Sequence, residues 1–251
     1  MTTFKMKPVY LFFASLLIFM LHLPVAFSSG KKVNTENVAL TATTTASNDN
    51  SALASMMMVY DSLHLDLKGL SEQAFTKAVK GIMVLRNAGR IANDNIISIA
   101  DFTKPSSQKR LFVIDLKNVK VLFNTYVAHG QHTGEAFAKY FSNKPESFQS
   151  SPGFYRTSST YMGKNGYSLK LEGLEAGIND LAESRAIVMH GAPYVSESFI
   201  HARGFLGRSW GCPAVPEELN KPIIEKIKNG TCLFIYSEDA NYQHRSRIIN
   251  S

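Results

Sequence analysis

The chain has 251 residues, 45% of them apolar, and a formal net charge of +7, which suits one globular domain with an additional segment. The positive charge is compatible with an anionic polymer, or with a peptide that carries carboxylates, as the partner. The sequence holds no long run of Lys or Arg and no alternation of aromatic and basic residues, so we predict no binding to nucleic acid.

The first 28 residues have the pattern of a secretory signal peptide. Lys5 and Lys7 supply a positive start, residues 9–23 are apolar, and residues 26–28 (Ala-Phe-Ser) form an acceptable cleavage site. The alternative is an uncleaved membrane anchor, but an apolar run of about 15 residues is shorter than the roughly 20 that a spanning helix needs. We therefore expect export to the periplasm or cell envelope.

Residues 29–52 are rich in Thr, Asn, Ser and Ala and have few large apolar side chains, so we expect a disordered linker. The next segment, 53–108, is predicted to be a helical N-terminal segment. Ser71 suits the start of a helix and Gly89 suits its end. Between them an apolar stripe indicates a face packed into a core: Phe75, Val79, Met83 and Leu85.

From about residue 109 the pattern changes to short apolar runs separated by turn residues, which predicts a mainly β domain over 109–240. We expect strands at 110–115, 119–128, 153–157, 168–174, 186–190 and 231–236. One helix is predicted at 216–228, because Pro216 suits its first turn and Gly230 follows its end. Residues 241–251 are polar, and we expect a frayed tail.

A histidine and a cysteine stand at positions that neighbouring elements would hold rigidly. His190 closes the apolar run 186–190, and Cys212 lies in a turn shortly before the predicted helix. A free thiol has a pKa of about 8.5, so little of it is the reactive thiolate at neutral pH. An imidazole within hydrogen-bond reach can take the thiol proton and return it to a leaving amine. The pair is therefore a candidate for nucleophilic catalysis, and Gly211 leaves room for backbone N–H groups beside a developing oxyanion.

Three short motifs carry a resemblance to one known family. They are His190-Gly191-Ala192-Pro193-Tyr194, Ser209-Trp210-Gly211-Cys212 and, upstream, Ser151-Pro152-Gly153-Phe154-Tyr155. The set, over about residues 109–237, resembles the L,D-transpeptidase catalytic domain (YkuD-like) family and, within it, the murein L,D-transpeptidase catalytic domain branch. The chain departs from the usual pattern in two ways: Ala214 stands where Arg or Asn is common, and the interval between histidine and cysteine is longer.

The resemblance implies a fold, a reaction and a set of catalytic residues. The fold is a mainly β, L,D-transpeptidase-like β-sandwich, here with an N-terminal helical appendage. Cys212 would be the nucleophile of an acyl transfer, and His190 would be its base and then its acid, oriented by the backbone carbonyl of Gly191. The N–H groups of Gly211 and Cys212 would stabilise the oxyanion. The resemblance implies neither a metal nor a cofactor.

The substrate implied by the resemblance is a peptidoglycan stem peptide, attacked at the carbonyl of its diamino-acid residue with release of D-alanine. An amine on a neighbouring stem would then resolve the thioester into a cross-link, and carbapenems should acylate the cysteine. Arg208 and Arg203 could pair with stem carboxylates, although both could equally be solvated surface groups. The candidate substrate-binding residues are Arg208, Ser209, Trp210, His129 and Tyr194.

Two other functions stay open at this point. If water rather than an amine resolves the thioester, the enzyme is an L,D-carboxypeptidase or endopeptidase. A hypothesis of a different class is a non-catalytic cell-wall-binding module in which Cys212 is merely buried. Alkylation of the thiol at neutral pH separates an activated cysteine from an inert one.

Three further arrangements of reactive residues have weaker support. Residues 207–211 match the G-x-S-x-G elbow of α/β-hydrolases, but no buried strand precedes the serine. His129 and His132 form a His-x-x-His pair that could contribute to a zinc site, but they are not on a predicted helix. Cys212 and Cys232 could form a disulfide in an exported protein, but Cys232 alternates with aromatic residues on a predicted strand and should pack in the core.

Overall fold

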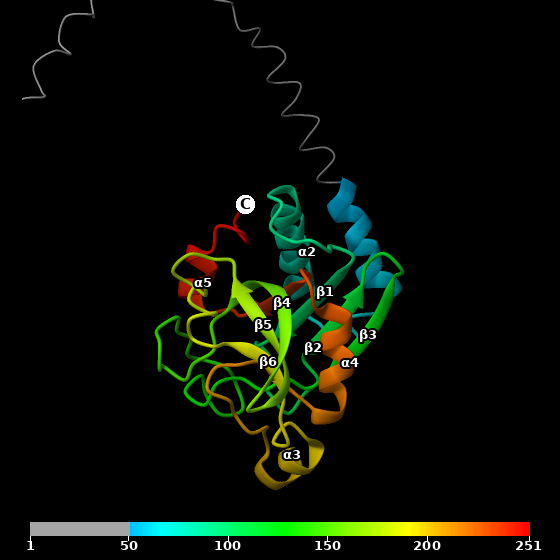
Figure 1. Cartoon of the computed structure of the whole chain (residues 1–251). Helices are drawn as coiled ribbons and strands as arrows, with labels where there is room; N and C mark the ends of the chain where they lie inside the picture. Colours follow the sequence, from blue (N-terminus) through cyan, green and yellow to red (C-terminus); the bar gives the residue numbers. More distant parts are fainter. Residues whose placement is uncertain (1–50) are drawn as a thin grey trace, which may run out of the picture. The chain divides into compact units, whose positions relative to one another are not determined.

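The computed structural model describes residues 51–251, and Figure 1 shows how their elements are arranged. These residues belong to the unit Ala46–Ser251 of the chain. The predicted signal peptide and all but the last two residues of the predicted linker lie outside the described residues. Within residues 51–251, no helix is both long enough and apolar enough to cross a membrane.

An eight-stranded mixed sheet organises the described residues. Its strands follow the order β3-β2-β1-β8-β4-β5-β6-β7. Parallel pairing joins β1 to β8 and β6 to β7, and the other neighbours are antiparallel. The strands are β1 (Ile96–Asp101), β2 (Leu111–Asp115), β3 (Lys120–Thr125), β4 (Gly153–Gly163), β5 (Gly166–Gly173), β6 (Val188–Gly191), β7 (Ala214–Val215) and β8 (Cys232–Tyr236).

The sheet nearly closes on itself. Ala128 and Gly130, in the segment that follows edge strand β3, form bridges with Ala214 of the opposite edge strand β7 and with Ser209. In the first bridge, Ala128 N donates to Ala214 O at 2.8 Å. A sheet that closes in this way encloses one of its own faces. The predicted mainly β fold with N-terminal helices is confirmed, and its strands form one continuous sheet.

Alternation along the strands divides the core between the two faces of the sheet. On β8, Cys232 and Phe234 belong to one apolar cluster, while Leu233 and Ile235 belong to the other. The helix α4 (Glu217–Ile227) packs three isoleucines into the second cluster. All five residues of β8 are buried because both of its faces are covered. The prediction that Cys232 is a packing residue of a core strand is confirmed.

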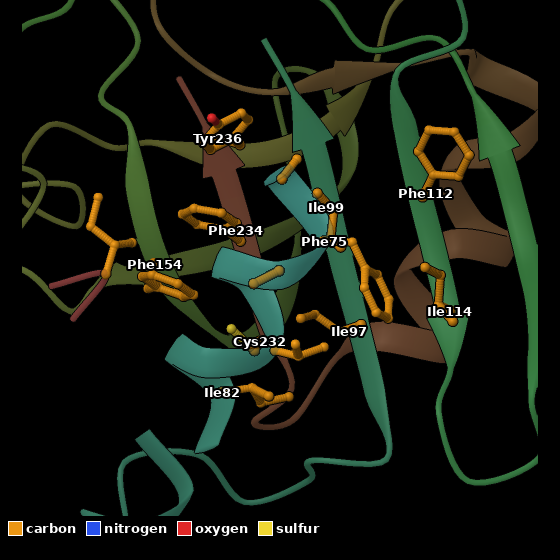
Figure 2. Packing of buried hydrophobic residues seen from close by; sticks show 14 of the residues in the cluster. Phe75, Ile82, Ile97, Ile99, Phe112, Ile114, Phe154, Cys232, Phe234 and Tyr236 are labelled. Atoms are coloured by element: carbon orange, nitrogen blue, oxygen red, sulfur yellow. The ribbon is translucent and has the colours of Figure 1, made fainter. Parts of the chain in front are cut away.

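Helix α2 (Glu72–Asn87) covers the first cluster, and a helical segment at 51–62 precedes it. Ser71 caps α2 by accepting a hydrogen bond from Ala74 N at 3.3 Å. The predicted apolar stripe is buried, and Figure 2 shows the helix lying across β1 and β8 with Phe75 directed at the sheet. A Cβ at Gly81 would lie 2.0 Å from Phe154 Cζ, so glycine allows this close approach. The helix is thus an integral part of the core.

One strand lies where only helix was predicted. β1 forms inside the segment 53–108 and occupies the position between β2 and β8. Five of its six residues are buried, so no alternating polar face marks it in the sequence. The helical prediction is therefore wrong at residues 96–101, and the sheet begins before residue 109.

The prediction of a frayed tail at 241–251 is also wrong. Helix α5 (Ala240–Arg245) is capped by Asp239, whose carboxylate accepts from Tyr242 N at 2.8 Å. Tyr242, Ile248 and Ile249 are buried in the cluster that α2 covers. Because only these few apolar side chains anchor the segment, its polar composition conceals the packing.

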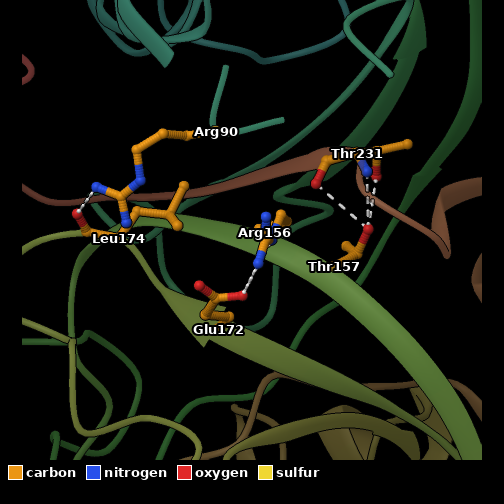
Figure 3. Close-up of polar contacts among 6 residues, drawn as sticks. All are labelled: Arg90, Arg156, Thr157, Glu172, Leu174 and Thr231. Atoms are coloured by element: carbon orange, nitrogen blue, oxygen red, sulfur yellow. Dashed lines mark hydrogen bonds and ion pairs between the residues drawn. The ribbon is translucent and has the colours of Figure 1, made fainter. Parts of the chain in front are cut away.

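Polar contacts fix β4 to its neighbours, as Figure 3 shows. Thr231 N donates to Thr157 Oγ1 at 2.9 Å, and this hydroxyl donates in turn to Ile227 O at 2.6 Å. Arg156 and Glu172 form an ion pair between β4 and β5. The contacts of Thr157 attach the last residue of α4 to the sheet.

Candidate active site

Strands β6 and β7 bring the two predicted reactive residues to one region. His190 and Ala214 are partners in the register of these strands, so Cys212 lies two residues before the partner of His190. Cys212 Sγ accepts a hydrogen bond from Val188 N at 3.5 Å, and the thiol also faces Ala186 O at 3.7 Å. The backbone leading into and along β6 therefore holds both side chains.

The backbone also sets the tautomer of His190. Its Nδ1 lies 2.9 Å from Gly191 O, and because a carbonyl only accepts, Nδ1 carries the proton. The free lone pair is then on Nε2. Burial lowers the pKa of His190, so the ring is neutral at neutral pH and can accept a proton. Among the hydrogen bonds of residues 51–251, none joins His190 to Cys212 in this conformation.

Burial governs the thiol as well. It raises the pKa of Cys212, while the Val188 N–H and the charge of Arg185 oppose that rise. Both the Cys212 thiol and the His190 imidazole are therefore neutral at rest, so the sulfur would have to lose its proton to act as the predicted nucleophile. Burial, with a smaller effect of the nearby sulfur, raises the pKa of Tyr194 to about 12, so this phenol is neutral too. Tyr194, a predicted substrate-binding residue, thus lies within electrostatic range of Cys212.

We call residues 209–212 the nucleophile turn, because they carry the predicted nucleophile Cys212, and Ser209 holds this turn together from inside. Its Oγ donates to Cys212 O at 2.7 Å and accepts from Gly211 N at 3.0 Å. Its backbone is tied to the neighbouring segment, because Ser209 N donates to His129 O and Gln131 N donates to Ser209 O. Ser209 is buried, and these contacts occupy its hydroxyl. The expectation that Ser209 binds substrate is therefore corrected: it shapes the turn.

Gly211 is needed for its conformation. Its φ of +123° disfavours any other residue, and a Cβ there would lie 2.8 Å from Gln149 O. The predicted role of its N–H in an oxyanion hole is corrected, because that N–H already donates to Ser209 Oγ. Of the two predicted donors, the N–H of Cys212 remains the candidate.

His129 does not line a cleft, contrary to our expectation. It is fully buried; its Nδ1 lies 2.8 Å from Arg110 Nη2, and its Nε2 lies 3.2 Å from Gly134 O. Burial and the Arg110 charge lower the pKa of His129 to about 3. His132 is instead exposed and bonds Ser147 O through Nδ1, so the two histidines do not form a zinc pair. Within residues 51–251, no three His, Cys, Asp or Glu side chains gather as metal ligands.

Trp210 and Arg208 lie at the surface of the nucleophile turn. Trp210 is 69% exposed and touches Phe148, with ring centroids 5.4 Å apart. Arg208 is half-buried and donates from Nη1 to Gln131 O at 3.3 Å and to Gly134 O at 3.1 Å. The guanidinium therefore braces the 131–134 segment, and the indole is the larger free surface beside the thiol.

Arg203 is exposed on a short helix that the sequence did not predict, α3 (Glu197–Arg203). This helix begins at the N-cap Ser196, whose hydroxyl accepts from Phe199 N, and ends at Gly204, which has a φ of +82°. None of its residues is buried, so it has no apolar stripe that would mark it.

Two further residues of this region were missed in the sequence. Arg185 precedes β6 and its charge acts on Cys212, and Phe148 supports the ring of Trp210. Arg185 is one residue before the apolar run that ends at His190, and that position is the only signal it gave. Phe148 gave none, because it lies in an irregular loop with a φ of +53°.

The geometry also bears on the other arrangements. The serine of the G-x-S-x-G match is buried and donates to the carbonyl of Cys212, so it is not poised as a nucleophile. Cys212 and Cys232 are both free thiols. Cys232 lies in the cluster beneath α2, whereas Cys212 packs against the other cluster, which agrees with the absence of a bridge.

The sequence profile of one protein family, described as L,D-transpeptidase catalytic domain, matches residues 66–236. The chain belongs to this family. The match covers more than half of the 251 residues and includes α2 and β1. The L,D-transpeptidase catalytic domain of this chain therefore includes part of the segment 53–108.

Several solved L,D-transpeptidase structures are similar at low identity. One from Mycobacterium smegmatis is 12% identical, with 57% of this chain aligned to 59% of that one and a TM-score of 0.35. One from Stackebrandtia nassauensis is 16% identical, with 67% aligned to 69% and a TM-score of 0.35. LdtMt1, in complex with imipenem, is 14% identical, with 57% aligned to 60% and a TM-score of 0.35. The chain spans less than two thirds of the first and third of these proteins, and a search of curated proteins found no match.

Proposed function

We propose that this chain is a murein L,D-transpeptidase, a cysteine acyl-transferase that acts on peptidoglycan stem peptides. Membership of the L,D-transpeptidase family supports the reaction class. The observation that carries the proposal is the fixed tautomer of His190, whose Nδ1–H is directed to Gly191 O and whose Nε2 is free to act as a base. Cys212, which accepts a hydrogen bond from Val188 N, is the thiol whose proton this base accepts in the proposal.

In the first half of the reaction, His190 Nε2 takes the Sγ proton as the sulfur attacks the donor carbonyl. The carbonyl π electrons move to its oxygen, and the N–H of Cys212 stabilises the resulting oxyanion. When the intermediate collapses, the C–N bond breaks and His190 returns its proton to the leaving amine. The products are a thioester on Cys212 and free D-alanine.

In the second half, an amine of a neighbouring stem attacks the thioester and passes a proton to His190 Nε2. The C–S bond breaks, Cys212 recovers the proton as a thiol, and a new amide cross-links the two stems. The exposed ring of Trp210 is the surface on which we expect one of the two peptides to lie. Water in place of the amine would instead give hydrolysis.

The test is intact-mass analysis of the protein after incubation with a tetrapeptide muropeptide, with and without an acceptor stem. We expect a thioester adduct on Cys212 and, when acceptor is present, a cross-linked dimer. A truncated muropeptide without dimer would assign the chain as a carboxypeptidase or endopeptidase. Binding without any adduct or product would favour the non-catalytic wall-binding module.

We further propose that the chain is exported to the periplasm or cell envelope, on the basis of the signal-peptide pattern in residues 1–28. Acylation of Cys212 by a carbapenem belongs to the same proposal, since the family includes a protein solved with imipenem. An imipenem adduct on any other residue would argue against Cys212 as the nucleophile.

A further inference from the structure

Arg185 makes four hydrogen bonds to one loop beside the nucleophile. Its Nη1 donates to Ser142 O at 2.8 Å and to Ser151 Oγ at 2.7 Å. Its Nη2 donates to Gln149 O at 2.6 Å and to Ser147 Oγ at 3.2 Å. A single planar guanidinium thus ties together positions 142 to 151, which is the fork geometry that arginine provides and lysine does not.

This loop touches the nucleophile turn from two sides. Phe148 packs against Trp210, and Ser150 Oγ donates to Gly211 O at 3.0 Å. The guanidinium itself is close to the turn, because a Cβ built on Gly211 would lie 3.4 Å from Arg185 Nη2. Arg185 therefore connects the loop, the turn and the start of β6.

Within the described part of the chain, no carboxylate pairs with Arg185. The ion pairs among residues 51–251 are Arg86–Asp94, Arg156–Glu172 and Lys228–Glu225. The groups that would interact with the Arg185 charge once ionised are the Tyr155 phenol and the Cys212 thiol. The phenol keeps its proton, because burial raises the pKa of Tyr155 far above its ordinary value. When Cys212 ionises, its thiolate can therefore serve as the counterion of the half-buried Arg185 guanidinium.

We infer that Arg185 is a positioning residue of the site, which holds the 142–151 loop against the nucleophile turn and supplies the positive charge that stabilises the Cys212 thiolate. His190, on the strand that holds the thiol, and Tyr194, whose pKa the sulfur affects, are both neutral at neutral pH, whereas Arg185 is the charged side chain that acts on Cys212. The guanidinium is therefore the permanent charge there. The inference rests on the proposed cysteine chemistry but concerns the free enzyme, so it can be tested without a substrate.

The test compares Arg185→Gln and Arg185→Lys with the wild type in the full chain. The rate of alkylation of Cys212 by iodoacetamide is measured between pH 6 and 10, with the labelled residue identified by peptide mass. Loss of an opposite charge close to a thiol raises its pKa, so Arg185→Gln should react about tenfold more slowly at pH 7. Arg185→Lys should stay within about threefold of the wild type, because it keeps the charge.

Trp210 supplies the second readout, because it is the only tryptophan in the chain and contacts the loop through Phe148. Both variants should change its fluorescence, since neither glutamine nor lysine can make the four contacts. The matched control is Arg156→Gln, which removes a half-exposed arginine from the ion pair with Glu172 and should change neither readout.

Wild-type alkylation rates in a folded Arg185→Gln would overturn the electrostatic role, and unchanged Trp210 fluorescence in both variants would overturn the clamping role. If Arg185→Gln does not fold, Arg185→Lys alone tests the inference. A Cys212 pKa that is clearly higher in Arg185→Lys than in the wild type, although the positive charge is kept, would contradict it. Failure of the proposed function has a different signature, namely a thiol that responds to Arg185 in a protein that leaves muropeptides unchanged.

Discussion

Replacing His190 by alanine tests the proposed proton transfer most directly. Burial raises the pKa of Cys212 above the ordinary value of about 8.5, so the thiolate fraction at pH 7 is below about 3%. His190 is neutral at that pH, and its Nε2 is free because Nδ1–H is bonded to Gly191 O. Under the proposed mechanism, the wild type depends on this base to generate the thiolate.

We expect His190→Ala to acylate about a hundredfold more slowly at pH 7, the usual size of a lost general base. The deficit should shrink toward alkaline pH, where hydroxide generates the thiolate without help. In the wild type, acylation should instead fall toward acid pH, because a protonated His190 cannot accept the thiol proton. A lowered pKa means that His190 protonates only as pH falls below about 6.5, so acylation should be retained at neutral pH and lost on that acid limb.

The assay is the rate of imipenem adduct formation on Cys212, followed by intact mass from pH 5 to 10. Far-ultraviolet circular dichroism of both proteins checks that the fold is kept. A deficit that stays constant across this range would assign His190 a role other than proton acceptor. A wild-type rate in the variant at pH 7 would mean that another group activates the thiol.

Cys212→Ala should abolish muropeptide turnover without loss of the folded state, as checked by product analysis and thermal unfolding; retained turnover would remove the central claim. Cys232→Ala should keep wild-type turnover and lose about 1–2 kcal/mol in urea unfolding, because a fully buried sulfur leaves a small cavity. In unreduced wild type, native protein should take up one equivalent of iodoacetamide and denatured protein two; no uptake after denaturation would reveal a bridge. Ser209→Ala should lower the free energy of unfolding by about 1–3 kcal/mol, since it leaves Gly211 N and Cys212 O without their partner. It should also slow acylation, and normal acylation would show that the turn keeps its shape without the Ser209 hydroxyl.

The local parts of the fold could be predicted wherever a repeating pattern coincided with an end signal. α2 carries an apolar stripe and starts after Ser71, and both features are present in the structure. β1 has neither, because a strand buried on both faces has no polar alternation. The C-terminal segment failed for the opposite reason: Tyr242 and two isoleucines anchor it, and so few residues do not change its polar composition.

In the candidate site, too, some residues could be predicted from the sequence and others could not. The pair His190 and Cys212 was accessible because motif and position pointed to the same residues. The polar neighbours were not, because proximity in sequence does not tell which way a side chain faces. His129 follows a strand as a cleft residue could, yet Arg110 fixes it in the core. Arg185 is 27 positions from Cys212 in the sequence, and only the folded chain brings its charge to the thiol.

The nucleophile turn itself explains which of its groups can meet a substrate. Ser209 Oγ is used by Gly211 N and Cys212 O, and Gly211 O accepts from Ser150 Oγ. A turn whose polar groups are committed to one another is rigid, which is what a nucleophile needs for a fixed line of attack. The groups that the turn does not bond within itself are the thiol, which Val188 N holds from β6, the N–H of Cys212, and the ring of Trp210, which is exposed. Bond formation, charge stabilisation and peptide contact would thus fall to adjacent groups of one short segment.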